Sequence, residues 1–361
     1  MTKPSELNVL APAGMSRRRI MQAMGAAGLA AAGASRPAAA ATALNLFTWQ
    51  TYGEKPFVDF SATKDFTIRP TYFSTSDEMV AKLRGGGGRL YDMIVPVQNY
   101  VQIAARAGLI EPLDMSRLTN VSKLFPEFVN TRHWTVDGKT YGAPFVWGAN
   151  AVAYNRAVTG EIDSIEALFD PKWRGRIGMR DEPEDALAIG ALKLGIRNPY
   201  QMDEAQLQEV KRLLISQKPL VRAYWKSIAE VQNMLASQEV VVSWAFLAVV
   251  KPLRDTGMDC GWVWPKEGAV GWNEGIALVK GSANKTAVED YANLTLSAEY
   301  GKMMALSSRY ATTSKDATAQ LDPAVVKDLG INTAQLGRLV FKENPPNRAR
   351  WVDIWNEVKN A

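Results

Sequence analysis

The sequence predicts an α/β protein built of two lobes with a hinged ligand cleft between them. Strand-like and helix-like segments alternate over residues 44–107 and again over residues 177–256. This order favours a parallel or mixed sheet covered by helices. Two extended apolar segments interrupt the alternation, and a length of 361 residues suits about two domains. Two α/β series joined by extended crossings would form the two lobes.

The first series contains three strands and three helices. Its strand-like runs are residues 44–49, 66–73 and 91–96, and its helix-like runs are residues 54–63, residues 98–107 and a segment that begins with a cap at Ser76. The helix capped at Ser76 has acidic residues in its first turn and stops at four glycines. These glycines lack the Gly-Lys-Ser/Thr ending of a phosphate-binding loop, so we interpret them as a connection between a helix and a strand.

The second series follows a break in the pattern. Asp137-Gly138 is a hairpin signal, and residues 147–155 form an extended apolar segment. The strands are then expected at residues 177–180, 240–245 and 260–265, and the helices at residues 184–194, 203–215, 227–236 and 246–256. Residues 271–280 are again extended, and the rest of the chain is mostly helical. The expected N-lobe is residues 44–146 plus 273–319, and the expected C-lobe is residues 147–272 plus 320–361.

Residues 1–43 have the three parts of a secretory signal peptide. A charged segment, SRRRIM, precedes a mildly apolar Ala/Gly-rich stretch, and small residues then offer cleavage after Ala41 or Ala43. The apolar stretch is short for a membrane span, which needs about 20 residues. We therefore expect export to the periplasm and removal of this segment.

Two adjacent arginines indicate the route of export. Arg17 and Arg18 follow Ser16 in a weakly hydrophobic leader, which is typical of twin-arginine signals. Translation could start at Met1 or at Met15, because the residues between them add nothing that a signal needs.

The composition argues against several classes of function. Outside the leader the chain has 37 basic and 36 acidic residues and no basic stripe, so no nucleic-acid partner is expected. A single cysteine, Cys260, and a single histidine, His133, exclude an intrachain disulfide and weaken any soft-metal or His-dependent catalytic site. Cys260 lies in an apolar run and is interpreted as a core residue. We expect no metal and no cofactor, and we expect a monomer.

Acidic residues follow one predicted strand. They surround Pro183 directly after residues 177–180 and are Asp181, Glu182, Glu184 and Asp185. Ligands of α/β proteins bind at the carboxyl ends of strands, where such acids could hold an ammonium group. Acids and a proline are also favourable in the first turn of any helix, so an ordinary helix start remains open.

Aromatic residues supply a second signal. Several lie at predicted strand ends or in the crossings, namely Trp49, Tyr52, Trp147, Trp225, Trp244, Trp264 and Trp272. Rings beside carboxylates suit a cation on a methylene chain, although any single Trp is more often a core residue than a ligand contact. A carboxylate pair such as Asp185 with Glu274 could instead belong to a hydrolase.

Longer motifs identify a resemblance. From Leu44 to the C-terminus the chain contains, in this order, LNLFTWQTY, FSTSDEMVAKL, YDMIVPVQNYV, YGAPFVWGANAVAYN, VVVSWA and WPKEGAVGWNEGIALVK. These segments resemble the spermidine/putrescine-binding proteins of polyamine ABC transporters, and WPKEG before a Trp-centred crossing is the most specific part. The resemblance implies a class II periplasmic binding protein fold, whose two lobes close on a ligand and dock on a membrane permease.

The resemblance also implies a ligand site in which aromatic residues surround the ligand and acids hold its amines. The matching positions are Trp49, Tyr52, Glu182, Asp185, Trp244, Trp272, Glu274 and Tyr310. Five residues in three motifs depart from the family pattern. Gln50 and Thr51 stand where an acid is usual, Val97 and Asn99 stand where Ser and Tyr are frequent, and Glu274 replaces an aspartate.

The expected function is therefore that of the periplasmic substrate-binding component of an ABC importer, without catalytic activity, for a cation such as putrescine or spermidine. An alternative is a receptor for another amine or an ω-amino acid, because Lys226 and Arg309 lie near aligned cleft positions and could meet a carboxylate. The alternative from another class is a periplasmic hydrolase that uses carboxylates.

Overall fold

The computed structural model describes residues 41–129, 132–331, 336 and 339–361. Residues 1–40 of the predicted export signal, including Arg17 and Arg18, lie outside the described residues. The folded unit that carries the site is residues 42–361. Within the described residues no helix is long and apolar enough to cross a bilayer.

The first α/β series folds as a parallel three-stranded unit. Strand β1 (Thr42–Thr48) pairs in parallel with β2 (Phe66–Tyr72) on one side and with β3 (Met93–Ile94) on the other. The helices of this series are α2 (Lys55–Ala62), α3 (Ser76–Arg84) and α4 (Gln98–Arg106). The cap of α3 is Thr75 and not Ser76, because the extended backbone of Thr75 lets its hydroxyl accept a hydrogen bond from the Glu78 N–H.

The second series forms another parallel unit. Strand β8 (Ile177–Arg180) lies between β10 (Val242–Phe246) and β9 (Val221–Trp225). Its helices are α6 (Pro183–Lys193), α7 (Glu204–Gln217), α8 (Ile228–Ala236) and α9 (Leu247–Asp255). Strand β9 was not predicted. Among the described strands it pairs with β8 alone, and its short sequence VRAYW carries a charged residue, which weakens the strand signal.

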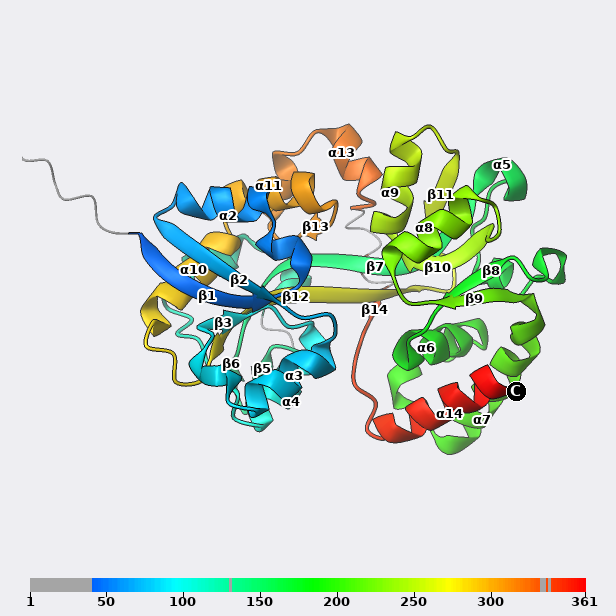
Figure 1. The fold of residues 1–361 in the computed structure, drawn as a ribbon, viewed down its shortest axis with the longest axis horizontal. Coiled ribbons are helices and arrows are strands. Elements are labelled where there is room, and N and C mark those ends of the chain that lie inside the picture. The colour runs from blue at the N-terminus through cyan, green and yellow to red at the C-terminus, as the bar shows by residue number, and fades with distance from the viewer. Residues whose placement is uncertain (1–40, 130–131, 332–335, 337–338) are drawn as a thin grey trace, which may run out of the picture. The chain divides into compact units, whose positions relative to one another are not determined.

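Two long antiparallel strands connect the series (Figure 1). Strand β7 (Ala143–Asn155) pairs with β12 (Ala269–Val279), and the sheet order is β2-β1-β3-β12-β7-β10-β8-β9. Short strands join these two: β4 (Ile110–Glu111) and β14 (Leu339–Phe341) pair with β12, and β11 (Cys260–Val263) and β13 (Ala311–Thr312) pair with β7. The hairpin of β5 (Thr135–Val136) and β6 (Lys139–Thr140) confirms the predicted turn, whose two central residues have positive φ.

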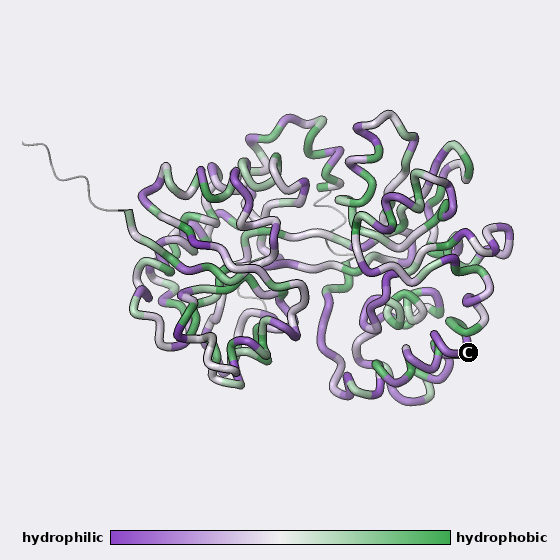
Figure 2. The backbone as a smooth tube through the Cα atoms, in the orientation of Figure 1, coloured by the Kyte–Doolittle hydropathy of each residue, from purple (hydrophilic) through white to green (hydrophobic). Residues whose placement is uncertain are grey.

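The remaining helices lie mostly in the last part of the chain, as predicted. They are α5 (Arg156–Thr159), α10 (Lys285–Thr295), α11 (Ala298–Ser308), α12 (Lys315–Ala319), α13 (Pro323–Asp328) and α14 (Arg348–Asn360). Helix α14 packs on α6 and α7 through Trp351, Ile354 and Trp355. The connection from β14 to α14, residues 342–347, is hydrophilic and has few apolar side chains to bury (Figure 2).

Separate hydrophobic cores lie under the two series. One group of core residues comes from β1, β3, α10 and α11, with Leu46, Met93 and Tyr291 among them. Another comes from β8, β10, α6, α7 and α14, with Ile177 and Leu187 among them. The two-lobed α/β architecture expected from the sequence is therefore confirmed. Cys260 is buried, as its apolar context predicted.

Candidate functional site

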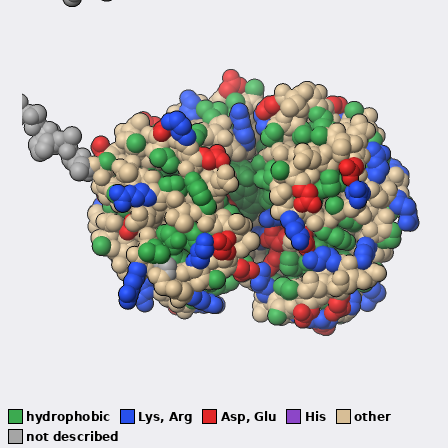
Figure 3. All heavy atoms as spheres, viewed as in Figure 1, with side chains coloured by type: hydrophobic (Ala, Val, Ile, Leu, Met, Phe, Trp, Pro, Cys, Tyr) green, Lys and Arg blue, Asp and Glu red, His purple; other side chains and the backbone are tan. Residues whose placement is uncertain are grey.

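A cavity of about 690 Å³ lies where the two series meet, and β12 forms its floor. Alternate residues of a strand point to the same face, so Val270, Trp272 and Glu274 all line the cavity. The intervening Asn273 points to the other face and accepts a hydrogen bond from the Trp134 indole at 2.7 Å. The space-filling view shows a hollow with hydrophobic side chains at its base and acidic and basic side chains beside it (Figure 3).

Glu274 occupies one end of this floor. The Tyr52 hydroxyl donates a short hydrogen bond to its carboxylate, and only 8% of Glu274 is exposed. No basic side chain among the described residues forms an ion pair with Glu274. Burial therefore raises the pKa of Glu274 to about 8, although the Tyr52 hydrogen bond partly opposes this shift.

Aromatic rings enclose the region beside Glu274. The rings of Trp272 and Tyr310 meet edge to face with centroids 4.9 Å apart, and Phe246 packs against the other side of Trp272 at 6.4 Å. Trp49, which lines the cavity opposite, is held by an edge contact to Phe73 at 4.4 Å. These rings offer apolar contact to a methylene chain and ring faces to a cation.

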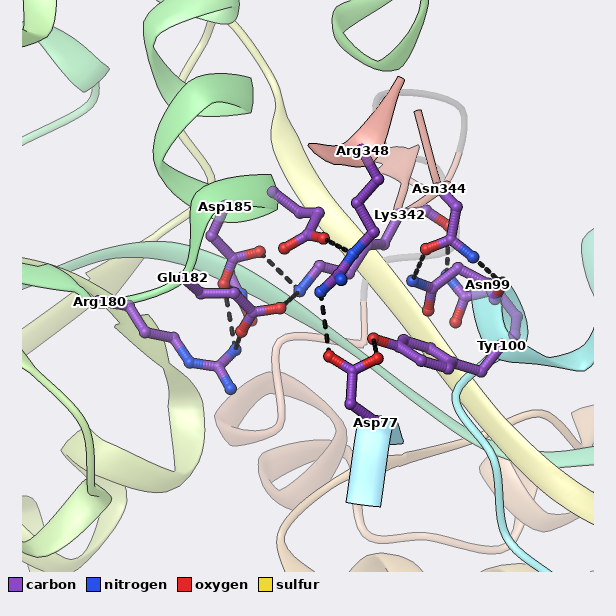
Figure 4. Close-up of polar contacts among 12 residues, drawn as sticks. Asp77, Asn99, Tyr100, Arg180, Glu182, Asp185, Lys342, Asn344 and Arg348 are labelled. Carbon is purple, nitrogen blue, oxygen red and sulfur yellow. Dashed lines mark hydrogen bonds and ion pairs between the residues drawn. The ribbon is translucent and has the colours of Figure 1, made fainter. Parts of the chain in front are cut away.

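The other end of the cavity holds a compact group of four charges (Figure 4). Arg180, at the end of β8, places Nη1 2.7 Å from Glu182 and 3.1 Å from Asp185. Lys342, in the connection after β14, contacts Glu182 and lies 3.0 Å from the second oxygen of Asp185. Burial opposes ionisation of Glu182, but Arg180 and Lys342 more than offset this and lower its pKa to about 2. Both acids are therefore neutralised by cations of the chain itself.

A third cation bridges the two series at the cavity rim. Arg348, the first residue of α14, contacts Glu184 of α6 and lies 3.2 Å from Asp77 at the start of α3. The Tyr100 hydroxyl also donates to Asp77, at 2.9 Å. Figure 4 shows Arg348 reaching down toward Asp77, with Arg180 to its left and Tyr100 to its right.

The structure brings six of the eight predicted site residues to the cavity wall. These are Trp49, Tyr52, Glu182, Trp272, Glu274 and Tyr310. Asp185 and Trp244 do not line the cavity, contrary to our expectation. Asp185 is fully buried because Asn150, Arg180 and Lys342 lie against it, and Asn150 donates to it at 2.7 Å.

Trp244 lies in the core of the second series. It is on the same face of β10 as Phe246, which does line the cavity, but two residues farther from the strand end, or about 7 Å. Opposite these residues on β7, Asn150 lines the cavity and Val152 is core. The boundary between the cavity and the core thus falls between the Phe246–Asn150 pair and the Trp244–Val152 pair of β10 and β7.

Among the described residues four cations line the cavity, and sequence reasoning named one of them, Lys226, but missed Arg180, Lys342 and Arg348. The two cations that it considered are less central: the Lys226 side chain is 78% exposed at 3.7 Å from Asp181, and Arg309 caps α11 beside a separate small pocket. Arg180 could have been found, since it is the last residue of a correctly predicted strand. Lys342 and Arg348 come from a connection far along the chain, which no local pattern places here.

The carboxylates of the cavity are not grouped as metal ligands among the described residues. No group of three or more His, Cys, Asp or Glu residues within the described part of the chain is arranged to hold a metal ion. The proposed hydrolase pair would need Asp185 and Glu274 on one surface, and Asp185 does not reach the cavity. The geometry is that of a ligand-binding cleft.

Comparison with known proteins agrees with this class. Residues 56–333 match the family described as bacterial extracellular solute-binding protein, and the chain belongs to this family. Members bind solutes for transport, so the prediction of a non-enzymatic binding protein is confirmed. The chain is 28% identical to the spermidine/putrescine-binding periplasmic protein of Escherichia coli over 293 residues, covering 79% of this chain and 81% of that protein. The predicted resemblance is therefore confirmed.

Solved structures share the fold. The spermidine/putrescine transporter substrate-binding protein of Streptococcus pneumoniae superposes with a TM-score of 0.78 at 20% identity, covering 88% of this chain and 99% of that one. A GABA receptor superposes with a TM-score of 0.72 at 19% identity, covering 88% and 97%. At these identities the likeness extends to the two-lobed fold alone.

Proposed function

We propose that this chain is the substrate-binding component of an ABC importer, and that it captures a small aliphatic amine of the polyamine class or a close relative of it. The cavity between the lobes would hold the ligand, and the closed complex would deliver it to a membrane permease. The single observation that supports this proposal best is Glu274, a buried carboxylate at the end of an aromatic-lined cavity with no basic partner among the described residues.

An ammonium group would supply what Glu274 lacks. A charge-assisted hydrogen bond from an ammonium to a desolvated carboxylate is stronger than a neutral one. The rings of Trp272 and Tyr310 would then contact the adjacent methylene groups. The name of the Escherichia coli relative, which matches most of the chain, points to the same chemistry.

A second candidate is an ω-amino acid. Arg180 and Lys342 line the cavity at the end away from Glu274, where a diamine would place its second ammonium. A ligand with a carboxylate at that end would meet cations in place of free acids.

The test is calorimetry of a carboxylate variant with a ligand chosen by thermal shift from diamines, polyamines, agmatine and ω-amino acids. A ligand at 100 times its Kd adds about 2.7 kcal/mol of stability, which such a screen detects. Glu274→Gln removes the charge that an ammonium would meet, so we expect a loss of about 2–5 kcal/mol, or about 30- to 4000-fold in affinity.

The matched control is Glu289→Gln. Glu289 is an equally buried carboxylate on α10, outside the cavity, where it pairs with Arg117. Its substitution should leave affinity within about threefold of wild type. If Glu274→Gln also binds within threefold, Glu274 is not an ammonium anchor.

We further propose the cellular location, export route, oligomeric state and lobe boundaries of the protein. The chain would be exported to the periplasm by a cleaved twin-arginine signal and would act as a monomer with no nucleic-acid partner. The lobes would be residues 44–146 plus 273–319 and residues 147–272 plus 320–361, a division supported by the separate cores on either side of the β7 and β12 crossings.

A further inference from the structure

The charges of the cavity wall are unevenly partnered. Five acids line it, and four of them form ion pairs: Asp77 and Glu184 with Arg348, Asp181 with Lys359, and Glu182 with both Arg180 and Lys342. Only Glu274 has no ion pair within the part of the chain that the structure describes. The cavity therefore offers a cation one free carboxylate.

The acids that the family resemblance assigns to a ligand amine are already occupied. The Lys342 ammonium lies against Glu182 and Asp185, and the side chain of Lys342 is 9% exposed. Its backbone is fixed as well, because the Gln98 side chain donates to the Lys342 carbonyl at 3.0 Å. A second ligand ammonium at this end would have to displace a held lysine and approach Arg180.

Arg180 presents unused hydrogen-bond donors to the cavity. The closest contacts of both acidic partners are with Nη1, and no side chain among the described residues forms a hydrogen bond with Nε or Nη2. The guanidinium is held over the Phe246 ring at 4.8 Å and near Trp225 at 6.0 Å. In Figure 4 the dashed lines of Arg180 run only toward Asp185 and Glu182. The Nε–Nη2 edge of an arginine is suited to a carboxylate, which it binds with two parallel hydrogen bonds.

The two ends lie within reach of one small ligand. Glu274 pairs with Val146 across the β12–β7 ladder and Val270 pairs with Asn150, so the floor between them is about 13 Å long at the backbone. Side chains from both ends shorten this span. Tyr310 lines the same cavity as Glu274 and Arg180, and its ring meets that of Trp272 edge to face.

We infer that the ligand carries one ammonium and one carboxylate on a short aliphatic chain, with the ammonium at Glu274 and the carboxylate on the free edge of Arg180. This inference rests on the proposed function and narrows its ligand class. Arg180 and Lys342 are then specificity-determining residues: Arg180 binds the carboxylate, and Lys342 neutralises the acids that would otherwise attract a second ammonium.

The test compares ligands of matched length on the wild-type protein. Calorimetry is run with ω-amino acids, α,ω-diamines and monoamines with chains of about three to six carbon atoms. We expect the best ω-amino acid to bind about tenfold or more tightly than the diamine and the monoamine of equal length, because the diamine juxtaposes like charges at Arg180. A diamine that binds as tightly as, or tighter than, its ω-amino acid overturns the inference and leaves the proposed function standing. If no amine of any kind binds, the proposed function itself fails.

Two variants assign the preference to residues. Arg180→Met should reduce ω-amino acid affinity by about tenfold or more and bring it close to that of the monoamine. The control is Arg222→Met, because Arg222 is an exposed arginine paired with Glu239. This control should change ω-amino acid affinity less than threefold. Lys342→Met leaves Arg180 as the remaining cation on Glu182, which lines the cavity, and should raise diamine affinity about tenfold. An Arg180→Met protein that is folded by circular dichroism and keeps the full ω-amino acid preference contradicts the assignment, as does a folded Lys342→Met protein with unchanged diamine affinity.

Discussion

Glu274 is the titratable residue that links ligand binding to pH. Its pKa is raised to about 8 by burial, so the carboxyl is mostly protonated below that pH. A bound ammonium favours the ionised form, and binding below pH 8 must therefore release a proton. Aliphatic ammonium groups stay protonated up to a pH of about 10, so the ligand itself does not titrate in this range.

We predict that affinity for the amine ligand falls about tenfold for each pH unit below about 7.5 and is nearly constant between about 8 and 9. Calorimetry at several pH values, in buffers of different ionisation enthalpy, measures both the slope and the released proton. In Glu274→Gln the slope and the proton release should vanish. An equally steep slope in that variant would assign the titration to another group.

The placement of single residues marks the limit of sequence reasoning. Tyr52, Trp272 and Glu274 were expected at the cavity because they match family motifs and lie at a strand end or in a crossing, and all three line it. Trp244 and Phe246 share a strand face, and only the depth of the lobe decides which one is core. The alternation of a strand gives the face on which a residue lies, but not its distance from the cavity, which depends on how the sheet packs against the other elements.

At the scale of elements, the start of α14 holds together the starts of α3 and α6. Arg348 contacts Asp77, whose side chain is 63% exposed, and Glu184, whose side chain is 4% exposed. Loss of a partner costs most where the remaining charge is buried. The two contacts of this one arginine should therefore differ in energy.

We predict that Arg348→Met lowers the free energy of unfolding by about 3 kcal/mol, because it leaves the buried Glu184 carboxylate without its cation. Asp77→Asn should lower it by less than about 1 kcal/mol, because an exposed pair contributes little. Urea denaturation of both variants gives the comparison. Equal costs would show that the Glu184 contact is not the stabilising one.

The sequence largely predicted which segments are helices or strands, but it did not predict which distant segments contact one another. Residues 177–180 and the Asp137-Gly138 turn came out where their patterns placed them, since apolar runs and turn residues act locally. Strand β9 was missed because the strand signal of its five residues is weak. The cap of α3 was misplaced by one residue because Thr75 and Ser76 are adjacent and both residue types cap helices. The path of residues 342–347 to the cavity depends on long-range hydrogen bonds such as Asn99 to Asn344, at 2.9 Å.

At the scale of the whole molecule, the folded unit begins at Thr42. Thr42 and Ala43 pair with Phe66 and Thr67 in the β1–β2 ladder, and the Thr42 N–H donates to the Asp65 carbonyl at 2.8 Å. Cleavage after Ala43 would remove two residues of this strand, whereas cleavage after Ala41 would leave it whole. We predict cleavage after Ala41, and intact-mass spectrometry of the periplasmic protein tests this. A mature chain that begins at Leu44 would contradict it.

Export as a whole should depend on the arginine pair of the leader. Arg17 and Arg18 are expected to be recognised as guanidinium groups, which present a planar fork of donors that lysine lacks. Changing both to Lys keeps the charge and the length of the leader, so only this recognition is lost. We predict that the precursor of the double variant stays in the cytoplasm and that the periplasmic fraction falls at least about tenfold, measured by fractionation and immunoblotting.

Changing Lys3 to Arg, upstream of Met15, serves as the control and should have no effect. Undiminished periplasmic protein in the double variant would mean that the general secretory route is sufficient for this chain.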